Sequence, residues 1–308
     1  MRYAREFFRY ARERHAIYLA RRRGDPAPWT VDPILQQYKF TNVFRELDRT
    51  TVWFRENVRD RMRTDPNVLL ATVVFRWFNR IEAGEAIFLQ RSLSGATAWD
   101  EFLATGSGEP LRAALLAYCD KGPYSTGAYI IHTPEGYSKL DGIIWCLVEF
   151  YKRDWQEFTE ALCLEDWTME AACQYLEGSR FMGDFMAYEV ACDLRWTRLL
   201  ERAPDIMTWA SPGRGARRGA RRVLGHIDGE DRVTYYKPST GKMRVKSLPA
   251  GESILLMRDL LARSQKKSNW PADWPAWEMR EVEHTLCEFD KYERVRRGEG
   301  RPRGTFRP

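Results

Sequence analysis

The chain has 308 residues, of which 44% are hydrophobic and 13% aromatic, enough to bury a sizeable core. Its formal net charge of +6 is modest but concentrated in arginine-rich stretches, which makes an anionic polymer a plausible partner. The six cysteines and four histidines show no CxxC, HxxxH or HExxH spacing, which excludes the common zinc and iron–sulfur patterns, and no apolar run is long enough to span a membrane.

The first half of the chain is predicted to be helical. Asp32-Pro33 has the residues of an N-cap and a first helical position, and predicts a long helix over residues 34–57. Asp65-Pro66 repeats this pair before residues 67–82, a segment that is apolar on nearly every side until its last turn, so we expect a buried helix there. Thr97 is followed by an acid three residues later, which predicts a capping box.

The second half continues the helical pattern and contains one candidate strand pair. We expect the strands within about residues 231–248, with "PSTGK" as their turn. Further helices are expected over residues 109–120, 139–151, 155–162, 168–176, 205–209, 252–264 and 277–297. The prediction is a mainly α fold, with a single helical domain over residues 1–297 and a basic flexible tail over residues 298–308.

Polar residues in the segment after Asp32 are the first candidates for substrate binding. Arg45 and Asp48 lie three residues apart and share a face of the expected helix, and Gln36 and Gln37 add amides. Polar groups beside a buried face need partners, which a ligand or the protein itself can supply. The alternative is a structural Arg–Asp pair.

A second candidate lies at the end of the expected buried helix. Arg76, Asn79 and Arg80 bring two guanidinium groups and an amide to a segment that is otherwise apolar. Arg76 and Arg80 are one turn apart and could hold one phosphate between them. The alternative is that they reach solvent or pair with acids elsewhere.

The stretch "LEGSRFMGDFMAYEVACDLRWT" carries the candidate catalytic acids. Gly178 and Gly183 interrupt a helical pattern and predict a hairpin whose backbone N–H groups face a DNA phosphate. Glu189 and Asp193 follow one turn apart, and two close carboxylates can serve as a general base and acid. The alternative is an acid pair that nearby arginines neutralise.

The stretch "SPGRGARRGARRVLG" is the candidate DNA-backbone contact. Gly213 and Gly215 allow close backbone approach, and Arg217, Arg218 and Arg221 supply charge at the start of an expected helix. Such contacts position a protein on nucleic acid without reading its sequence. The spacing GxxxxGK[ST] is absent, so the sequence does not support ATP binding, and the alternative is a solvated basic face.

Several segments together resemble the alpha-glutamyl/putrescinyl thymine pyrophosphorylase family, also described as the helical domain of 5-hydroxymethyluracil DNA kinases. They are "DPILQQYKFTNVFRELDRTT", "FRWFNRI", "GAYIIHTP", "GDFMAYEVACDLRWT", "PGRGARRGARRV" and "LCEFDKYERVRRGEGRPR". The family is similar to helix-hairpin-helix DNA glycosylases, in which a glycine-rich hairpin precedes an aspartate. The resemblance assigns these parts to Gly178–Gly183 and Asp193, although "EGSRFMG" departs from the compact proline–glycine form and Asp193 arrives early.

The resemblance implies DNA base hypermodification in bacterial viruses, in the cytoplasm of the infected host. A separate kinase phosphorylates 5-hydroxymethyluracil in double-stranded DNA, and an amino acid or amine, such as glycine, serine or putrescine, then displaces phosphate or pyrophosphate. Because a P-loop is absent, the chain fits this transferase better than the kinase, with no cofactor or metal. Tyr188, Trp77 and Trp196 are candidates to stack on a flipped base, although a core role fits each of them too. A glycosylase and a non-catalytic DNA-binding module that partners the kinase are the alternatives.

Overall fold

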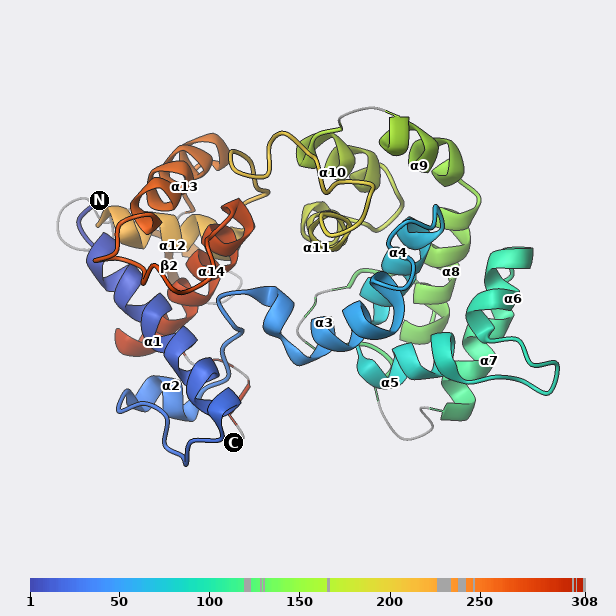
Figure 1. Cartoon of the computed structure of the whole chain (residues 1–308), viewed down its shortest axis with the longest axis horizontal. Helices are drawn as coiled ribbons and strands as arrows, with labels where there is room; N and C mark the ends of the chain where they lie inside the picture. The colour runs from blue at the N-terminus through green and yellow to red at the C-terminus, as the bar shows by residue number, and fades with distance from the viewer. Residues whose placement is uncertain are drawn as a thin grey trace. The chain divides into compact units, whose positions relative to one another are not determined.

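The protein is mainly α-helical, as expected (Figure 1). The computed structural model describes residues 1–118, 123–127, 129, 131–164, 167–225, 234–237, 242–245, 247–300, 302 and 304–306. Contacts divide the chain into two compact units, one formed by Met1–Asp48 with Ile206–Pro308 and the other by Arg49–Asp205. We call them the terminal unit and the central unit. The single domain expected over residues 1–297 stays a prediction.

The terminal unit is built around its last helix, α14, which packs against α1, α12 and α13 (Figure 1). Its helices are α1 (Ala4–Arg23), α2 (Pro33–Gln37), the 3₁₀ turn η1 (Arg45–Leu47), α12 (Arg214–Leu224), α13 (Ala250–Ser264) and α14 (Met279–Arg296). Two strands, β1 (Thr234–Lys237) and β2 (Lys242–Val245), pair antiparallel in this unit. Residues 238–241 of the expected turn lie outside the described residues, and its last residue, Lys242, begins β2.

Glycines of α12 allow this helix to approach α14 closely. A Cβ atom at Gly215 would overlap the thiol of Cys287, and one at Gly219 would overlap the backbone carbonyl of Leu286. The neighbour at Gly219 is backbone, which cannot move aside as a flexible side chain can. The glycine spacing of this segment therefore serves helix packing inside the terminal unit.

The long helix expected over residues 34–57 is wrong. Asp32 caps the segment as expected, since its carboxylate accepts hydrogen bonds from the N–H groups of the second and third helical residues. However, α2 ends at Gln37 because Tyr38 is extended and forms an isolated antiparallel bridge with Thr305. The rest of the segment becomes η1, α3 (Arg49–Phe54) and the π-helical turn η2 (Arg55–Arg59).

The central unit is organised around α4 (Val68–Phe78), which packs against α8, α9 and α11 (Figure 1). All 11 residues of α4 are buried, so the expectation of a buried helix is confirmed. The other elements are α5 (Ile81–Gly84), the π-helical turn η3 (Glu85–Leu89), α6 (Ala98–Thr105), α7 (Glu109–Tyr118), α8 (Lys139–Tyr151), α9 (Trp155–Leu164), α10 (Met169–Glu177) and α11 (Asp184–Leu194).

Helix ends in the central unit follow local hydrogen bonding. The capping box expected at Thr97 is confirmed, since Thr97 and Asp100 bond each other's backbone N–H groups. The helix expected to begin at residue 67, after Asp65-Pro66, begins one residue later, at Val68. The Asp65 carboxylate accepts a hydrogen bond from the N–H of Asn67, directly before α4. The helix expected over residues 205–209 is wrong, because that segment is a turn and Asp205 instead caps α10 through two backbone N–H groups.

His15 of α1 is buried inside a cluster of aromatic rings. Its side chain is enclosed by the rings of Tyr18, Phe44, Trp270 and Trp274, at centroid distances of 4.6–5.9 Å. Both ring nitrogens are buried, and neither has a hydrogen-bond partner among the residues that the structure describes. Burial, with a smaller contribution from the neighbouring Arg14 charge, lowers the pKa of His15 from 6.5 to about 4.

We expect His15 to make the protein acid-sensitive between about pH 6.5 and 4. In this window the unfolded chain binds a proton that the folded protein excludes, so the contribution of His15 to the free energy of unfolding falls by about 3 kcal/mol as pH decreases. Glu281 has the opposite effect. Burial raises its pKa to about 7, so the folded protein binds a proton there more tightly than the unfolded chain does, and a fall in pH stabilises the folded state. The measurement is therefore the free energy of unfolding in urea, compared between wild type and His15→Phe across this pH range. A difference between the two proteins that does not change with pH contradicts the prediction.

Candidate functional site

Arg76 and Asp193 meet in the core of the central unit. Arg76 lies in the last turn of α4 and Asp193 in the last turn of α11, and the two helices pack against each other. Arg76 donates from Nε to Asp193 Oδ2 at 2.5 Å and from Nη2 to Oδ1 at 2.8 Å. The side chains are only 4% and 2% exposed, so this is a bidentate ion pair removed from water.

A second guanidinium group shares the same carboxylate. Arg59, at the end of η2, places Nη1 3.5 Å from Asp193 Oδ1, and its Nε lies 3.3 Å from Asp60. Its side chain is 2% exposed. Asp193 therefore holds two buried cations, which corresponds to the neutralised alternative that the sequence left open for this acid.

Arg76 keeps its charge despite complete burial. Burial by itself would lower the pKa of Arg76, but the charge of Asp193, interaction with Tyr129 and the hydrogen bonds to Asp193 outweigh it and raise that pKa well above its ordinary value. Arg76 therefore stays ionised inside the protein core.

Glu189 is connected to this network through a tyrosine. The hydroxyl of Tyr129 donates to Glu189 Oε2 at 2.6 Å, and Arg76 Nη1 lies 3.5 Å from the same hydroxyl. Glu189 is 4% exposed. Sequence reasoning missed Tyr129 as a site residue, although it belongs to "GAYIIHTP", one of the segments that carry the family resemblance.

The two neighbours expected beside Arg76 behave differently. Asn79 ends α4 in the left-handed conformation, at φ 47°, and its side-chain oxygen accepts from Arg76 Nη1 at 3.0 Å. Arg80 instead pairs with Glu82 at 3.2 Å. Arg76 and Arg80 thus have different carboxylate partners, and a phosphate held between them stays a prediction.

Aromatic side chains lead from the network to the surface of the central unit. Phe185 contacts the ring of Tyr129 edge-on at 4.8 Å and is 42% exposed. Phe181 lies in the loop between Gly178, which ends α10, and Gly183, which caps α11, and its side chain is 42% exposed. Its φ of 63° is in the left-handed region, which bulky residues rarely adopt. The predicted stacking residues are less accessible: Tyr188 is 2% exposed, Trp77 1% and Trp196 36%.

The residues expected to bind substrate near Asp32 belong to the terminal unit. Arg45 and Asp48 form an ion pair at 2.5 Å, as the structural alternative proposed. The side chain of Gln36 donates to the backbone carbonyl of Thr30 at 2.6 Å, and the backbone carbonyl of Gln37 accepts from the chain near its C-terminus. Binding of substrate by these four residues stays a prediction.

The arginines expected to contact DNA from α12 have partners within the terminal unit. Arg217 and Arg221 donate to backbone carbonyls at residues 247–248, and Arg218 pairs with Asp290 at 2.8 Å. The N–H of Gly213 donates to the Glu283 carboxylate at 3.1 Å. Contacts of these residues with DNA stay predictions.

In the described part of the chain, no three His, Cys, Asp or Glu side chains are grouped so that they could bind a metal ion. None of the described helices combines the length and apolar character needed to cross a bilayer.

The fold and the network define a helical protein with a buried guanidinium–carboxylate centre, and the comparisons identify its family. The model of the family described as "5-hmdU DNA kinase, helical domain" matches residues 2–301, so the chain belongs to this family. A 5-hmdU DNA kinase of Bacillus phage SP10 is 27% identical over an alignment of 290 residues, and the match covers 87% of this chain and 41% of the phage protein. The chain thus spans less than half of that relative. No solved structure matches.

Proposed function

We propose that this protein transfers an amino acid or amine of the glycine, serine or polyamine class onto phosphorylated 5-hydroxymethyluracil in double-stranded DNA, displacing phosphate or pyrophosphate. A DNA kinase supplies the phosphorylated base, and the setting is the cytoplasm of a phage-infected bacterium. Family membership over residues 2–301 is the observation that carries the proposal. The relative from a Bacillus phage, named as a 5-hmdU DNA kinase, supports the modified base and the viral setting.

The reaction is a substitution at the carbon attached to position 5 of the base. A C–N bond forms between that carbon and the incoming amine, and the C–O bond to the phosphate breaks. The leaving phosphate or pyrophosphate takes the bonding electron pair. The amine, which is an ammonium ion in water, must lose protons, so the site needs a base on one side and cations for the leaving group on the other.

Glu189 is our candidate for the base. Asp193 is held by two guanidinium groups, whereas Glu189 accepts from the hydroxyl of Tyr129, which contacts the exposed Phe185. A hydroxyl between a buried carboxylate and the surface can pass a proton inward. We therefore assign Glu189 to proton removal and Asp193 to holding the arginines in place.

Arg76 is our candidate for stabilising the departing phosphate. Two of its contacts, to Thr51 Oγ1 and to Tyr129 Oη, are 3.5 Å long. Such contacts are weak, so phosphate oxygens can replace them without breaking the shorter bonds to Asp193.

The test of the function is the product. The purified protein is incubated with kinase-treated 5-hydroxymethyluracil DNA and a mixture of amino acids and amines, and the digested nucleosides are analysed by mass spectrometry. The expected result is an aminated nucleoside within intact DNA, formed only when the DNA has been phosphorylated. An abasic site instead identifies a glycosylase, and an unchanged nucleoside from an active preparation contradicts both enzyme proposals.

A non-catalytic DNA-binding module that works with the kinase is the second candidate. It is favoured by one observation: Asp193 and Glu189 are both buried and both have partners, as in a purely structural network. This candidate predicts that the protein retains DNA and increases phosphorylation by the kinase while forming no adduct itself. The same nucleoside analysis, with and without kinase, separates the two candidates.

A further inference from the structure

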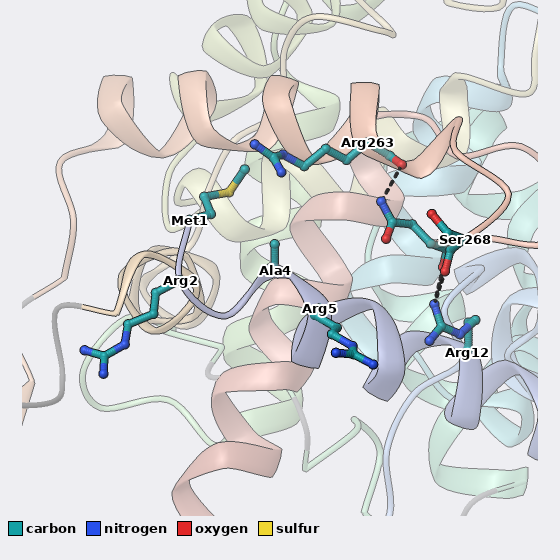
Figure 2. Close-up of a pocket in the computed structure, with 8 residues that line it drawn as sticks. Met1, Arg2, Ala4, Arg5, Arg12, Arg263 and Ser268 are labelled. Carbon is teal, nitrogen blue, oxygen red and sulfur yellow. Dashed lines mark hydrogen bonds between the residues drawn. The ribbon is translucent and has the colours of Figure 1, made fainter.

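Two neighbouring hollows lie along α1 and are lined mainly by arginine. The larger, of about 570 Å³, is lined by Arg5 and Arg12 of α1 and by Arg263, Ser268 and Asn269 at and after the end of α13, together with residues 1, 2 and 4. The smaller, of about 300 Å³, is lined by Arg5, Glu6, Arg9 and Arg12. Figure 2 shows Arg5 and Arg12 projecting from α1 and Arg263 from the neighbouring helix.

Three of these arginines form a stripe along one face of α1. Arg5, Arg9 and Arg12 lie at positions i, i+4 and i+7, which share a face of a helix. From Arg5 to Arg12 the helix rises about 10 Å, which is close to three phosphate steps of about 3.4 Å along the axis of one strand of B-DNA. The spacing therefore suits a polymer of phosphates better than a single anion.

The charge of this stripe is not neutralised by an ion pair with any residue that the structure describes. Arg5 and Arg9 are exposed, and neither makes an ion pair with any residue that the structure describes. Arg12 donates from Nη1 to the backbone carbonyls of Ser268 and Asn269, at 3.0 and 2.8 Å, which fixes its position (Figure 2). It makes no ion pair with a carboxylate in the described part of the chain. In contrast, Arg263 has a carboxylate partner, Asp259.

Glu6 is the acid that lines the smaller hollow, and it does not cancel the stripe. Its Oε2 atom is buried and has no hydrogen-bond partner in the described structure. A carboxylate that forms no bond to the adjacent arginines weakens the local positive potential only through space. Removing the charge of Glu6 therefore provides a second test of whether the ligand is negatively charged.

We propose that Arg5, Arg9 and Arg12 form a groove on α1 that binds the sugar–phosphate backbone of double-stranded DNA, independently of base sequence and of base modification. We base the inference on three observations: the exposed arginines without ion pairs in the described structure, their spacing along one face of α1, and the hollows that they line. The inference rests on the proposed function because it takes DNA as the ligand, and it adds α1 as the helix that binds the DNA backbone. The arginines of α12, which were expected to do this, are engaged within the protein.

The test uses unmodified, fluorescently labelled duplex DNA and the full chain, with anisotropy measured from about 50 to 200 mM salt. Arg5→Gln/Arg9→Gln is expected to weaken binding about tenfold, and to reduce the magnitude of the slope of log K against log salt by about 2, since each lost phosphate contact contributes about 0.9. Arg5→Lys/Arg9→Lys is expected to keep most of the slope, and Glu6→Gln to tighten binding.

The matched control removes two exposed arginines outside the groove, Arg22 and Arg202, as Arg22→Gln/Arg202→Gln. It is expected to leave the affinity and the slope near those of wild type. Equal weakening in the control, or an unchanged slope in Arg5→Gln/Arg9→Gln, overturns the groove. Because the DNA is unmodified and no turnover is measured, this result is independent of the nucleoside analysis: either proposal can fail while the other stands.

Discussion

Asp193→Ala is expected to lower the free energy of unfolding by about 3–5 kcal/mol, because it leaves the Arg76 guanidinium buried without its carboxylate and removes one of the two carboxylates beside Arg59. Arg76 and Arg59 are 4% and 2% exposed in their side chains, so neither can regain water without local unfolding. Urea unfolding followed by circular dichroism measures the change. Glu201→Ala is the matched control: it removes an ion pair with Arg63 whose side chains are 57% and 30% exposed, and should cost less than about 1 kcal/mol.

The double variant Arg76→Met/Asp193→Leu tests whether the cost arises from the unpaired charge. Replacing both partners of a buried ion pair by apolar residues is often close to neutral, so the double variant should be clearly more stable than Asp193→Ala. Arg59 still has Asp60 as a partner. If the double variant is as unstable as the single one, packing around Asp193, rather than its charge, stabilises α4 against α11.

The local features of the fold were predictable because they depend on neighbouring residues. The apolar character of residues 68–75 is enough to predict that α4 is buried, and Thr97 with Asp100 is enough to predict a helix start. The long helix after Asp32 failed for the opposite reason. It ends where Tyr38 pairs with Thr305, and nothing in the local sequence indicates a partner so distant along the chain.

The candidate site was predictable as a set of residue types but not as a set of pairs. Two arginines and two acids in apolar helices indicate a buried ionic centre. However, Arg76 could have paired with either acid, and it lies 117 residues from Asp193 along the chain. Tyr129 and Arg59 were missed because a single tyrosine in a loop and a single arginine in a polar segment give no sequence signal.

The two arginine-rich helices show why composition alone misplaces a DNA-binding surface. In α12 the glycines are needed for packing against α14, and the arginines reach carbonyls and acids of the same unit. In α1 the arginines at positions 5 and 9 are exposed and make no ion pair within the described part of the chain. Whether a basic segment can meet phosphate therefore depends on which acids the fold brings to it.

Glu189→Gln is expected to lower the rate of amine transfer by about 10²–10⁴-fold, the usual contribution of a general base. The amide keeps the shape of the side chain and an oxygen that accepts from Tyr129, so the fold should survive, but it cannot take a proton from the amine. Tyr129→Phe should also slow transfer, because it removes the hydroxyl between Glu189 and the surface. The rate is measured as nucleoside adduct formed per unit time, with duplex affinity measured in parallel.

The control for this prediction is Glu177→Gln, the same chemical change at an exposed position of α10. It should transfer at the wild-type rate. A purely structural network gives a different pattern: Glu189→Gln would then lose stability and retain its rate per folded molecule. Asp193 is held by two arginines, and Glu189 accepts a hydrogen bond from the Tyr129 hydroxyl. Full transfer activity in a folded Glu189→Gln variant would therefore show that Glu189 is not the base.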